Sequence, residues 1–260
     1  MNRSTLAAYL DRIGVSRPQL IDAASLRALH QAHQRAVPFE NLSIHLGEPI
    51  SLAPGDLLDK IVTRRRGGFC YELNGAFALL LEALGARVTR VAARTAGRDG
   101  RLGPPFDHLA LIVSTTDGTG PWLADVGFGS HSTFPLLLDR RAGQDDPGGR
   151  FLLADTAEGD VVVSKDAAVQ YQIERRSRAL ADFSPTCWWQ QTSPDSHFTG
   201  ATICSRLTGE GRISVSGETL IRTSGGVRTE QRLHGAAEVL AVYRNHFGII
   251  LDRVPGRSVS

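Results

Sequence analysis

The 260-residue sequence has few cysteines and little net charge, and each shortage excludes a class of protein. Cys70, Cys187 and Cys204 are odd in number and far apart, with no CxxC pair and no Cys/His cluster. A disulfide framework or a structural zinc site is therefore not expected, no metal cofactor is indicated, and a reducing, cytoplasmic location is favoured. A formal net charge of +2 gives no reason to expect a nucleic-acid or membrane partner.

Long apolar stretches are also missing. No run of about 18 apolar residues is present, so no membrane-spanning helix is expected. The first ten residues carry a charge but lack the apolar segment that is typical of a signal peptide. There is no internal repeat and no low-complexity segment, and the length suits one large domain or two to three small ones.

The most informative stretch reads RRRGGFCYELN over residues 64–74. Apolar residues then recur at helical spacing as far as Gly85, which places Cys70 at the N-terminus of a predicted helix. Gly67 and Gly68 permit a sharp turn before it. Free N–H groups, the helix dipole and nearby arginines favour negative charge, so a lowered pKa and a nucleophilic thiolate are expected for Cys70. The alternative is that this cysteine is simply a small buried apolar residue.

The rest of the chain changes from helical to strand patterns near residue 86. Helices are predicted at 4–13, capped by Ser4 and ended by Gly14, and at 22–36 and 57–63. Short strands separated by Gly/Asp turns follow, which is typical of a β-barrel or sandwich, and a closing helix is predicted at 236–247. The predicted strands are 87–95, 108–113, 122–126, 136–138, 151–154, 161–164, 169–174, 203–207, 212–216 and 218–223.

A β-hairpin is predicted from the strands 108–113 and 122–126. The Asp-Gly pair at 117–118 between them suits a two-residue type I′ turn. That turn sets a register in which His108 and Asp125 are diagonal neighbours on one face, roughly 7–8 Å apart at Cα. A slip of one residue would move them to opposite faces.

Cys70, His108 and Asp125 then form a candidate catalytic triad. A histidine can take the proton of a thiol, and a carboxylate orients that histidine and stabilises its positive form. Papain-like and transglutaminase-like enzymes divide the roles in the same way, with the nucleophile on a helix and its partners on strands.

Two loops have a structural and a functional interpretation each. Glu40 in the apolar turn 37–42 is either a solvated loop charge or a buried partner of Arg66. The loop 126–130 contains two glycines around Phe128, which is either a tight turn or a place where a ligand approaches the backbone.

These segments together carry a family resemblance. RGGFCYELN at 66–74 resembles the RGGxCxExN signature of the arylamine N-acetyltransferases, and VPFENL at 37–42 is similar to their PFEN segment. His108, the DVGFG stretch at 125–129 and SPDSHF at 193–198 are similar to later family motifs and occur in family order.

The resemblance implies an α+β fold with three parts. These are a helical bundle over 1–85 with the cysteine, a β-barrel over 86–186 with the histidine and aspartate, and an α/β lid over 187–260. It implies acetyl transfer from acetyl-CoA to an arylamine, arylhydrazine or N-hydroxyarylamine through an acetyl-cysteine, with ping-pong kinetics.

The resemblance also implies roles for single residues. It implies that Gly127, Phe128 and Gly129 line the coenzyme and acceptor cleft, that Phe39, Phe69 and Phe128 contact the substrate, and that Glu40 and Arg66 form a structural ion pair.

Three other functions are considered for the same residues, and two of them fit. An amide synthase that closes an ansamycin-type macrolactam would use the same triad with an intramolecular amine. A thiol hydrolase would use water as the acceptor. A non-catalytic binding module is disfavoured because all three triad residues are present.

Overall fold

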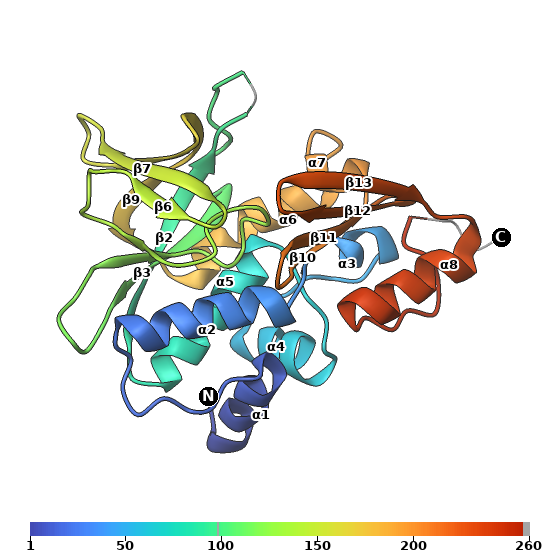
Figure 1. The fold of residues 1–260 in the computed structure, drawn as a ribbon, viewed down its shortest axis with the longest axis horizontal. Coiled ribbons are helices and arrows are strands. Elements are labelled where there is room, and N and C mark those ends of the chain that lie inside the picture. Colours follow the sequence, from blue (N-terminus) through green and yellow to red (C-terminus); the bar gives the residue numbers. More distant parts are fainter. Residues whose placement is uncertain (98, 257–260) are drawn as a thin grey trace.

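The computed structural model describes residues 1–97 and 99–256. Residue 98, in the predicted loop 96–106, and the last four residues of the predicted lid lie outside them. The N-terminal part is helical, as predicted, and lies at the bottom of Figure 1. Its elements are α1 (Arg3–Ile13), α2 (Ala23–Ala36), α3 (Leu42–Leu46), α4 (Pro54–Leu58), a π-helix (Asp59–Thr63) and α5 (Cys70–Ala83).

The helix starts agree with the predictions from local sequence in part. The Asp22 carboxylate accepts the backbone N–H of Ser25 at 2.7 Å and caps α2. For α1 the predicted cap was wrong: Asn2, not Ser4, accepts the N–H of Thr5 at 2.8 Å. The predicted helix 57–63 begins earlier, at Pro54, and widens into a π-helix over its last five residues, whereas α3 was not predicted.

Eight antiparallel strands form the middle of the chain, in the order β5-β4-β3-β2-β9-β8-β7-β6. The sheet is a nearly closed barrel, at the upper left of Figure 1. Its end strands are joined by one side chain, because Gln144 exchanges hydrogen bonds of 2.8 and 3.0 Å with the backbone of Leu137. The strands are β2 (Arg87–Thr95), β3 (His108–Ser114), β4 (Trp122–Ala124), β5 (Leu136–Leu137), β6 (Gln144–Asp146), β7 (Gly149–Asp155), β8 (Val161–Lys165) and β9 (Ala168–Ser177).

The predicted register of the β3–β4 hairpin is confirmed. Leu111 pairs with Ala124 and Val113 with Trp122, which is the pairing that an Asp117-Gly118 centre implies. The predicted two-residue turn is wrong, because β3 ends at Ser114 and β4 begins only at Trp122. The longer loop leaves the register unchanged, because the paired residues Val113 and Trp122 are equally distant from the Asp117-Gly118 pair.

The C-terminal part contains a five-stranded antiparallel sheet in the order β1-β10-β11-β12-β13. Its edge strand β1 comes from the helical part of the chain, so the two regions share one sheet. The strands are β1 (Phe39–Glu40), β10 (Ile203–Leu207), β11 (Gly211–Ser216), β12 (Thr219–Ser224) and β13 (Val227–Arg232). Strand β13 was not predicted, and β1 lies in the segment 37–42 that was predicted to be a turn.

Short helices flank this sheet. The predicted closing helix is α8 (Gly235–Val242), continued by a π-helix (Tyr243–Phe247), and the other elements are a 3-10 turn (Leu180–Phe183), α6 (Ser184–Thr192) and α7 (His197–Gly200).

Helix α5 occupies the centre of the core. Leu73, Phe77 and Leu80 are fully buried and pack with side chains from α1, α2 and β3. The burial of nearly the whole helix fixes the position of its first residue, Cys70. None of the described helices is both long enough and apolar enough to cross a membrane. The division of the chain into three domains at residues 85 and 186 stays a prediction.

Candidate active site

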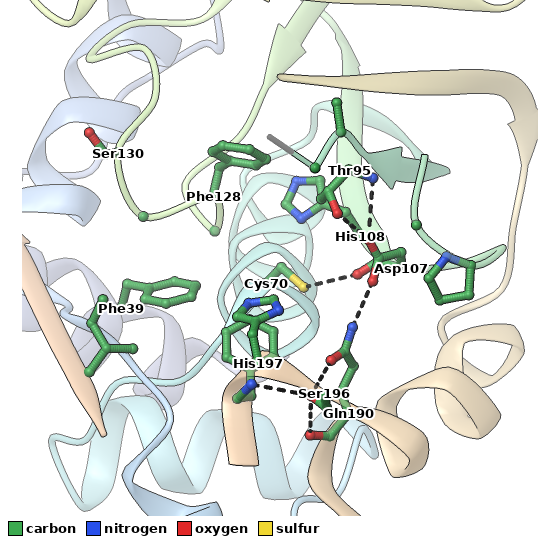
Figure 2. A pocket seen from close by; sticks show the side chains of 18 of the residues that line it. Phe39, Cys70, Thr95, Asp107, His108, Phe128, Ser130, Gln190, Ser196 and His197 are labelled. Atoms are coloured by element: carbon green, nitrogen blue, oxygen red, sulfur yellow. Dashed lines mark hydrogen bonds between the residues drawn. The ribbon is translucent and has the colours of Figure 1, made fainter. Parts of the chain in front are cut away.

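Cys70 is the first residue of α5 and lies at the wall of a cavity of about 760 Å³. The cavity is lined by the barrel on one side and by α6, α7 and the five-stranded sheet on the other. Figure 2 shows the Cys70 sulfur, the His108 ring and Phe128 around one space. The side chains of Gln190 and His197 also line the cavity and lie below them in this view. The residue is only 4 % exposed, and its Sγ lies 4.0 Å from the backbone oxygen of Asp107.

The sequence-predicted contact between His108 and Asp125 is present. The Nε2 atom of His108 lies 2.7 Å from Oδ2 of Asp125, and both side chains are almost fully buried. Oδ1 of the same carboxylate accepts the backbone N–H of Gly127 at 3.0 Å. Because Nε2 is held by Asp125, the other ring nitrogen, Nδ1, is the one left for a proton from Cys70.

The electrostatic prediction for Cys70 is wrong in sign. Burial raises the pKa of the Cys70 thiol well above its usual range, and the carboxylates of Asp107 and Asp125 act in the same direction. A backbone hydrogen bond from Leu109 opposes them only in part. The neighbouring arginines were expected to lower the pKa of Cys70, but they are not among the groups that shift it. Arg66, the nearest in sequence, is paired with Glu40. A thiolate at this position therefore requires transfer of its proton to a neighbouring base.

Asn74 completes the support of the carboxylate and was missed as a functional residue. Its Nδ2 atom donates to Oδ1 of Asp125 at 2.8 Å and to the backbone oxygen of Leu109 at 2.6 Å. Its Oδ1 accepts the N–H of Val126 at 2.9 Å. Asn74 lies one helical turn after Cys70, so the spacing of four residues within RGGFCYELN was the available signal.

The electrostatics of Asp125 follow from these contacts. Burial raises the pKa of the Asp125 carboxyl, but the charge and hydrogen bond of His108, with the Asn74 donor, outweigh burial. The pKa is held far below its usual range, so Asp125 is ionised throughout the physiological range.

The loop after β4 approaches the cysteine closely. A Cβ atom on Gly127 would lie 2.8 Å from both Nδ2 of Asn74 and Cα of Cys70, so no larger residue fits without movement. Gly129 adopts a positive φ of 88°, which favours glycine. Gly127, Phe128 and Gly129 all line the cavity.

The three phenylalanines predicted to contact substrate differ in position. Phe39 and Phe128 both line the cavity (Figure 2). Phe69 is fully buried and is not among the lining residues; it packs edge-on against Phe198 with ring centroids 5.4 Å apart. Phe69 therefore supports a wall of the cavity and does not form one.

A buried ion pair lies beneath the cysteine turn. Arg66 and Glu40 approach to 3.0 Å with side chains 7 % and 0 % exposed, and Glu48 lies 3.2 Å from the same guanidinium. Burial raises the pKa of Glu40, but Lys60 and Arg66 outweigh it and lower the pKa below its usual value. A second pair, Lys60 and Glu72, is 2.6 Å apart.

The tight turn before Cys70 has a different cause from the one predicted. Neither Gly67 nor Gly68 has a positive φ. A Cβ atom on Gly67 would collide with the backbone oxygen of Pro38, and one on Gly68 would lie within 2.8 Å of three Glu72 side-chain atoms. Glycine is needed here for space, so that two neighbouring segments can pack against the turn.

A polar network joins the C-terminal helices to the barrel. Gln190 on α6 donates to Oδ1 of Asp107 at 2.6 Å, and Ser196 donates to Oε1 of Gln190 at 2.6 Å (Figure 2). The other Asp107 oxygen accepts from Thr95. Ser196 belongs to the SPDSHF stretch, but no pattern in the sequence pointed to Gln190 or Asp107, because their contact joins segments more than 80 positions apart.

The arrangement can carry out nucleophilic acyl transfer. It has a thiol at a helix start and a histidine with one ring nitrogen held by a carboxylate. The apolar cavity beside them has room for an acyl group next to the sulfur.

Comparisons with known proteins agree with this chemistry. The N-acetyltransferase family profile matches residues 22–255. A curated arylamine N-acetyltransferase of Mycolicibacterium smegmatis is 34% identical, over 98% of this chain and 95% of its own length. The solved arylamine N-acetyltransferase of M. tuberculosis superposes with a TM-score of 0.86 at 34% identity and covers 94% of this chain and 93% of its own. That of Mycobacterium marinum, solved in complex with CoA, gives a TM-score of 0.86 at 32% identity, over 94% and 92% of the two chains.

Proposed function

The chain belongs to the arylamine N-acetyltransferase family, and on this premise we propose that it transfers acetyl from acetyl-CoA to nitrogen by a ping-pong mechanism through acetyl-Cys70. The acceptors are arylamines, arylhydrazines or N-hydroxyarylamines. The observation that carries the proposal is that Cys70 and His108 line the same cavity and that Asp125, behind His108, lies 2.7 Å from its Nε2 atom.

In the first half-reaction Cys70 becomes acetylated. His108 takes the Sγ proton at Nδ1, and Asp125 stabilises the imidazolium through Nε2. The thiolate attacks the carbonyl carbon of the thioester, and backbone N–H groups at the start of α5 stabilise the oxyanion. The C–S bond to coenzyme A breaks as the new thioester forms, and His108 returns its proton to the departing sulfur.

In the second half-reaction the amine takes the acetyl group. An arylamine is weakly basic, so its nitrogen is unprotonated and nucleophilic at neutral pH. The nitrogen attacks the acetyl carbon while His108 removes its proton, and the bond to Cys70 Sγ breaks. His108 protonates the sulfur, and the free thiol is restored.

Coenzyme A fits the residues present as a co-substrate. The cavity beside Cys70 has an apolar lining from Phe39 and Phe128, and Gly127 lines it while packing closely against Cys70. The M. marinum relative, which binds CoA, supports the same donor for this chain. A cytoplasmic location is part of the proposal, because Cys70, Cys187 and Cys204 are all free thiols and the reaction needs a reduced one.

The test is intact-protein mass after mixing with acetyl-CoA alone. Wild type gains one acetyl group, Cys70→Ala gains none, and Cys204→Ala, which changes a buried cysteine away from the cavity, behaves as wild type. Addition of an arylamine discharges the adduct. No adduct on wild type would overturn the proposal, and an adduct lost rapidly without amine would favour the thiol hydrolase.

A further inference from the structure

The five-stranded sheet presents two chemically different faces. Successive residues of a strand point to opposite faces, so its register defines which side chains share a face. Cys204, Ile213 and Val215 pack into the core beneath α8. The opposite face lines the cavity that contains Cys70, through Phe39, Ile203, Ser205, Ser214 and Arg212.

Arg212 is a partly buried cation on that cavity face. Its guanidinium makes one hydrogen bond to a side chain, from Nη1 to the hydroxyl of Ser205 at 3.1 Å. The Ser205 hydroxyl is in turn 2.8 Å from that of Ser214. Among the described residues no carboxylate forms an ion pair with Arg212, and burial lowers the pKa of its guanidinium to about 10.

A neighbouring arginine shows how this sheet otherwise satisfies a guanidinium. Arg206, one strand away on the opposite face, donates to the backbone oxygens of His246 and Arg35 at 3.1 and 2.6 Å. Arg212 has no such carbonyl partners within the described ranges. Burying a cation without a counter-charge is unfavourable, so an anion that enters the cavity gains a charge-assisted contact there.

A second cation, Lys165 of the barrel, interacts electrostatically with Arg212, although it is not among the residues that line the cavity. Lys165, the last residue of β8, is half-buried, and burial together with the charge of Arg212 lowers the pKa of its ammonium, against the raising effects of Asp166 and Asp146. The two cations thus come from different sheets. Two acidic residues also line the cavity: Asp107 is already held by Thr95 and Gln190, and Asp195 is exposed.

We propose that Arg212, with Ser205 and Ser214, forms a subsite for an anionic group of a bound substrate, which is a carboxylate or a phosphate. The proposal rests on the proposed function and deepens it, because the subsite lies on the wall of the same cavity as Cys70. The group comes from one of two sources. An acceptor such as an aminobenzoate supplies a carboxylate, and coenzyme A supplies phosphates.

The experiment compares matched charged and uncharged substrates. The acceptors are 4-aminobenzoate and its methyl ester, and the donors are acetyl-CoA and S-acetylpantetheine, which has no phosphate. Each pair gives a ratio of kcat/KM values for wild type, Arg212→Gln and Arg212→Lys. Arg222→Gln is the matched control, because Arg222 lies on the neighbouring strand and is exposed.

The expected result is a selective loss. Arg212→Gln lowers kcat/KM for the anionic member of one pair by about tenfold or more, since a hydrogen bond to a charged group is worth roughly 1.5–3 kcal/mol. The uncharged member is unaffected, Arg212→Lys keeps part of the preference, and Arg222→Gln keeps all of it. A change in the acceptor ratio identifies the carboxylate, and a change in the donor ratio identifies the phosphate. Unchanged ratios in both pairs overturn the inference.

Thermal unfolding of wild type tests the subsite without a variant and without catalysis. An anion that binds the folded protein raises its unfolding temperature. We expect 4-aminobenzoate or coenzyme A to raise it more than the methyl ester or pantetheine does, and equal shifts in both pairs overturn the inference. If wild type acetylates neither acceptor, the proposed function fails, but the thermal comparison still decides whether the anion site exists.

Discussion

Replacing Asn74 by aspartate tests the support of the triad carboxylate. The substitution keeps the size of the side chain and an oxygen that can accept the N–H of Val126, 2.9 Å away. It removes the donor that reaches Asp125 at 2.8 Å and Leu109 at 2.6 Å. A second carboxylate then faces Asp125 at hydrogen-bond distance in a site without water access.

The magnitude follows from these contacts. Two carboxylates at this distance do not both ionise, and the pKa of the new carboxyl rises by about three units. At 1.36 kcal/mol per unit, this amounts to about 4 kcal/mol. The folded-state pKa is raised above the unfolded value of about 4, so stability is retained below about pH 4 and is lost as the pH rises through the raised pKa.

The assay is denaturant unfolding of wild type, Asn74→Asp and Asn74→Ala at about pH 5 and about pH 8, on either side of the expected pKa. Asn74→Ala loses the same hydrogen bonds without adding a charge, so its deficit of about 3–5 kcal/mol does not change between the two pH values. At about pH 5, one unit above the unfolded value, Asn74→Asp has lost only about 1.4 of the 4 kcal/mol, because its protonated carboxyl donates to Asp125 as the amide does. A deficit of Asn74→Asp that is equal at both pH values would refute the reasoning.

Three further substitutions have defined outcomes. Asp125→Asn lowers kcat by about 10³–10⁴-fold, because an amide no longer holds the histidine as imidazolium; a loss under tenfold in steady-state acetyl transfer would contradict this. Gly127→Ala costs about 1–3 kcal/mol in denaturant unfolding and slows acetylation of Cys70, because the added Cβ meets Cys70 Cα at 2.8 Å; an unchanged midpoint argues against that contact. Glu40→Gln lowers the free energy of unfolding by about 3–5 kcal/mol, because Arg66 keeps its buried charge with only Glu48 beside it; an unchanged denaturation midpoint would show that Glu48 suffices.

The triad geometry was accessible from sequence because it depends on short-range rules. Helical periodicity placed Cys70 at a helix start, and the strand alternation around Asp117-Gly118 placed His108 and Asp125 on one face. The type of turn was wrong, yet the prediction held, since register depends only on the centre of symmetry of the loop.

What could not be predicted depends on burial and on distant segments. The sign of the Cys70 pKa shift was missed because the depth of a residue is a property of the assembled core, and desolvation there exceeds the effect of a helix terminus. Arg212 and Gln190 reach the cavity only through strand and helix packing that involves residues far away in the chain. Phe69 belongs to the same sequence motif as Cys70. Only the packing shows that Phe69 contacts Phe198 on the side away from the cavity.

The pairing of β1 with β10 has a consequence for synthesis on the ribosome. Phe39 and Glu40 leave the ribosome before the entire barrel, and their partners Ser205 and Cys204 follow only after it. At about 5–20 residues per second, the nascent chain holds an unpaired edge segment for roughly ten seconds or more. Such an edge can pair with another chain. The pairing of β1 with β10 is therefore a late step in folding. This pairing also completes the part of the cavity wall that Phe39 and Ser205 form.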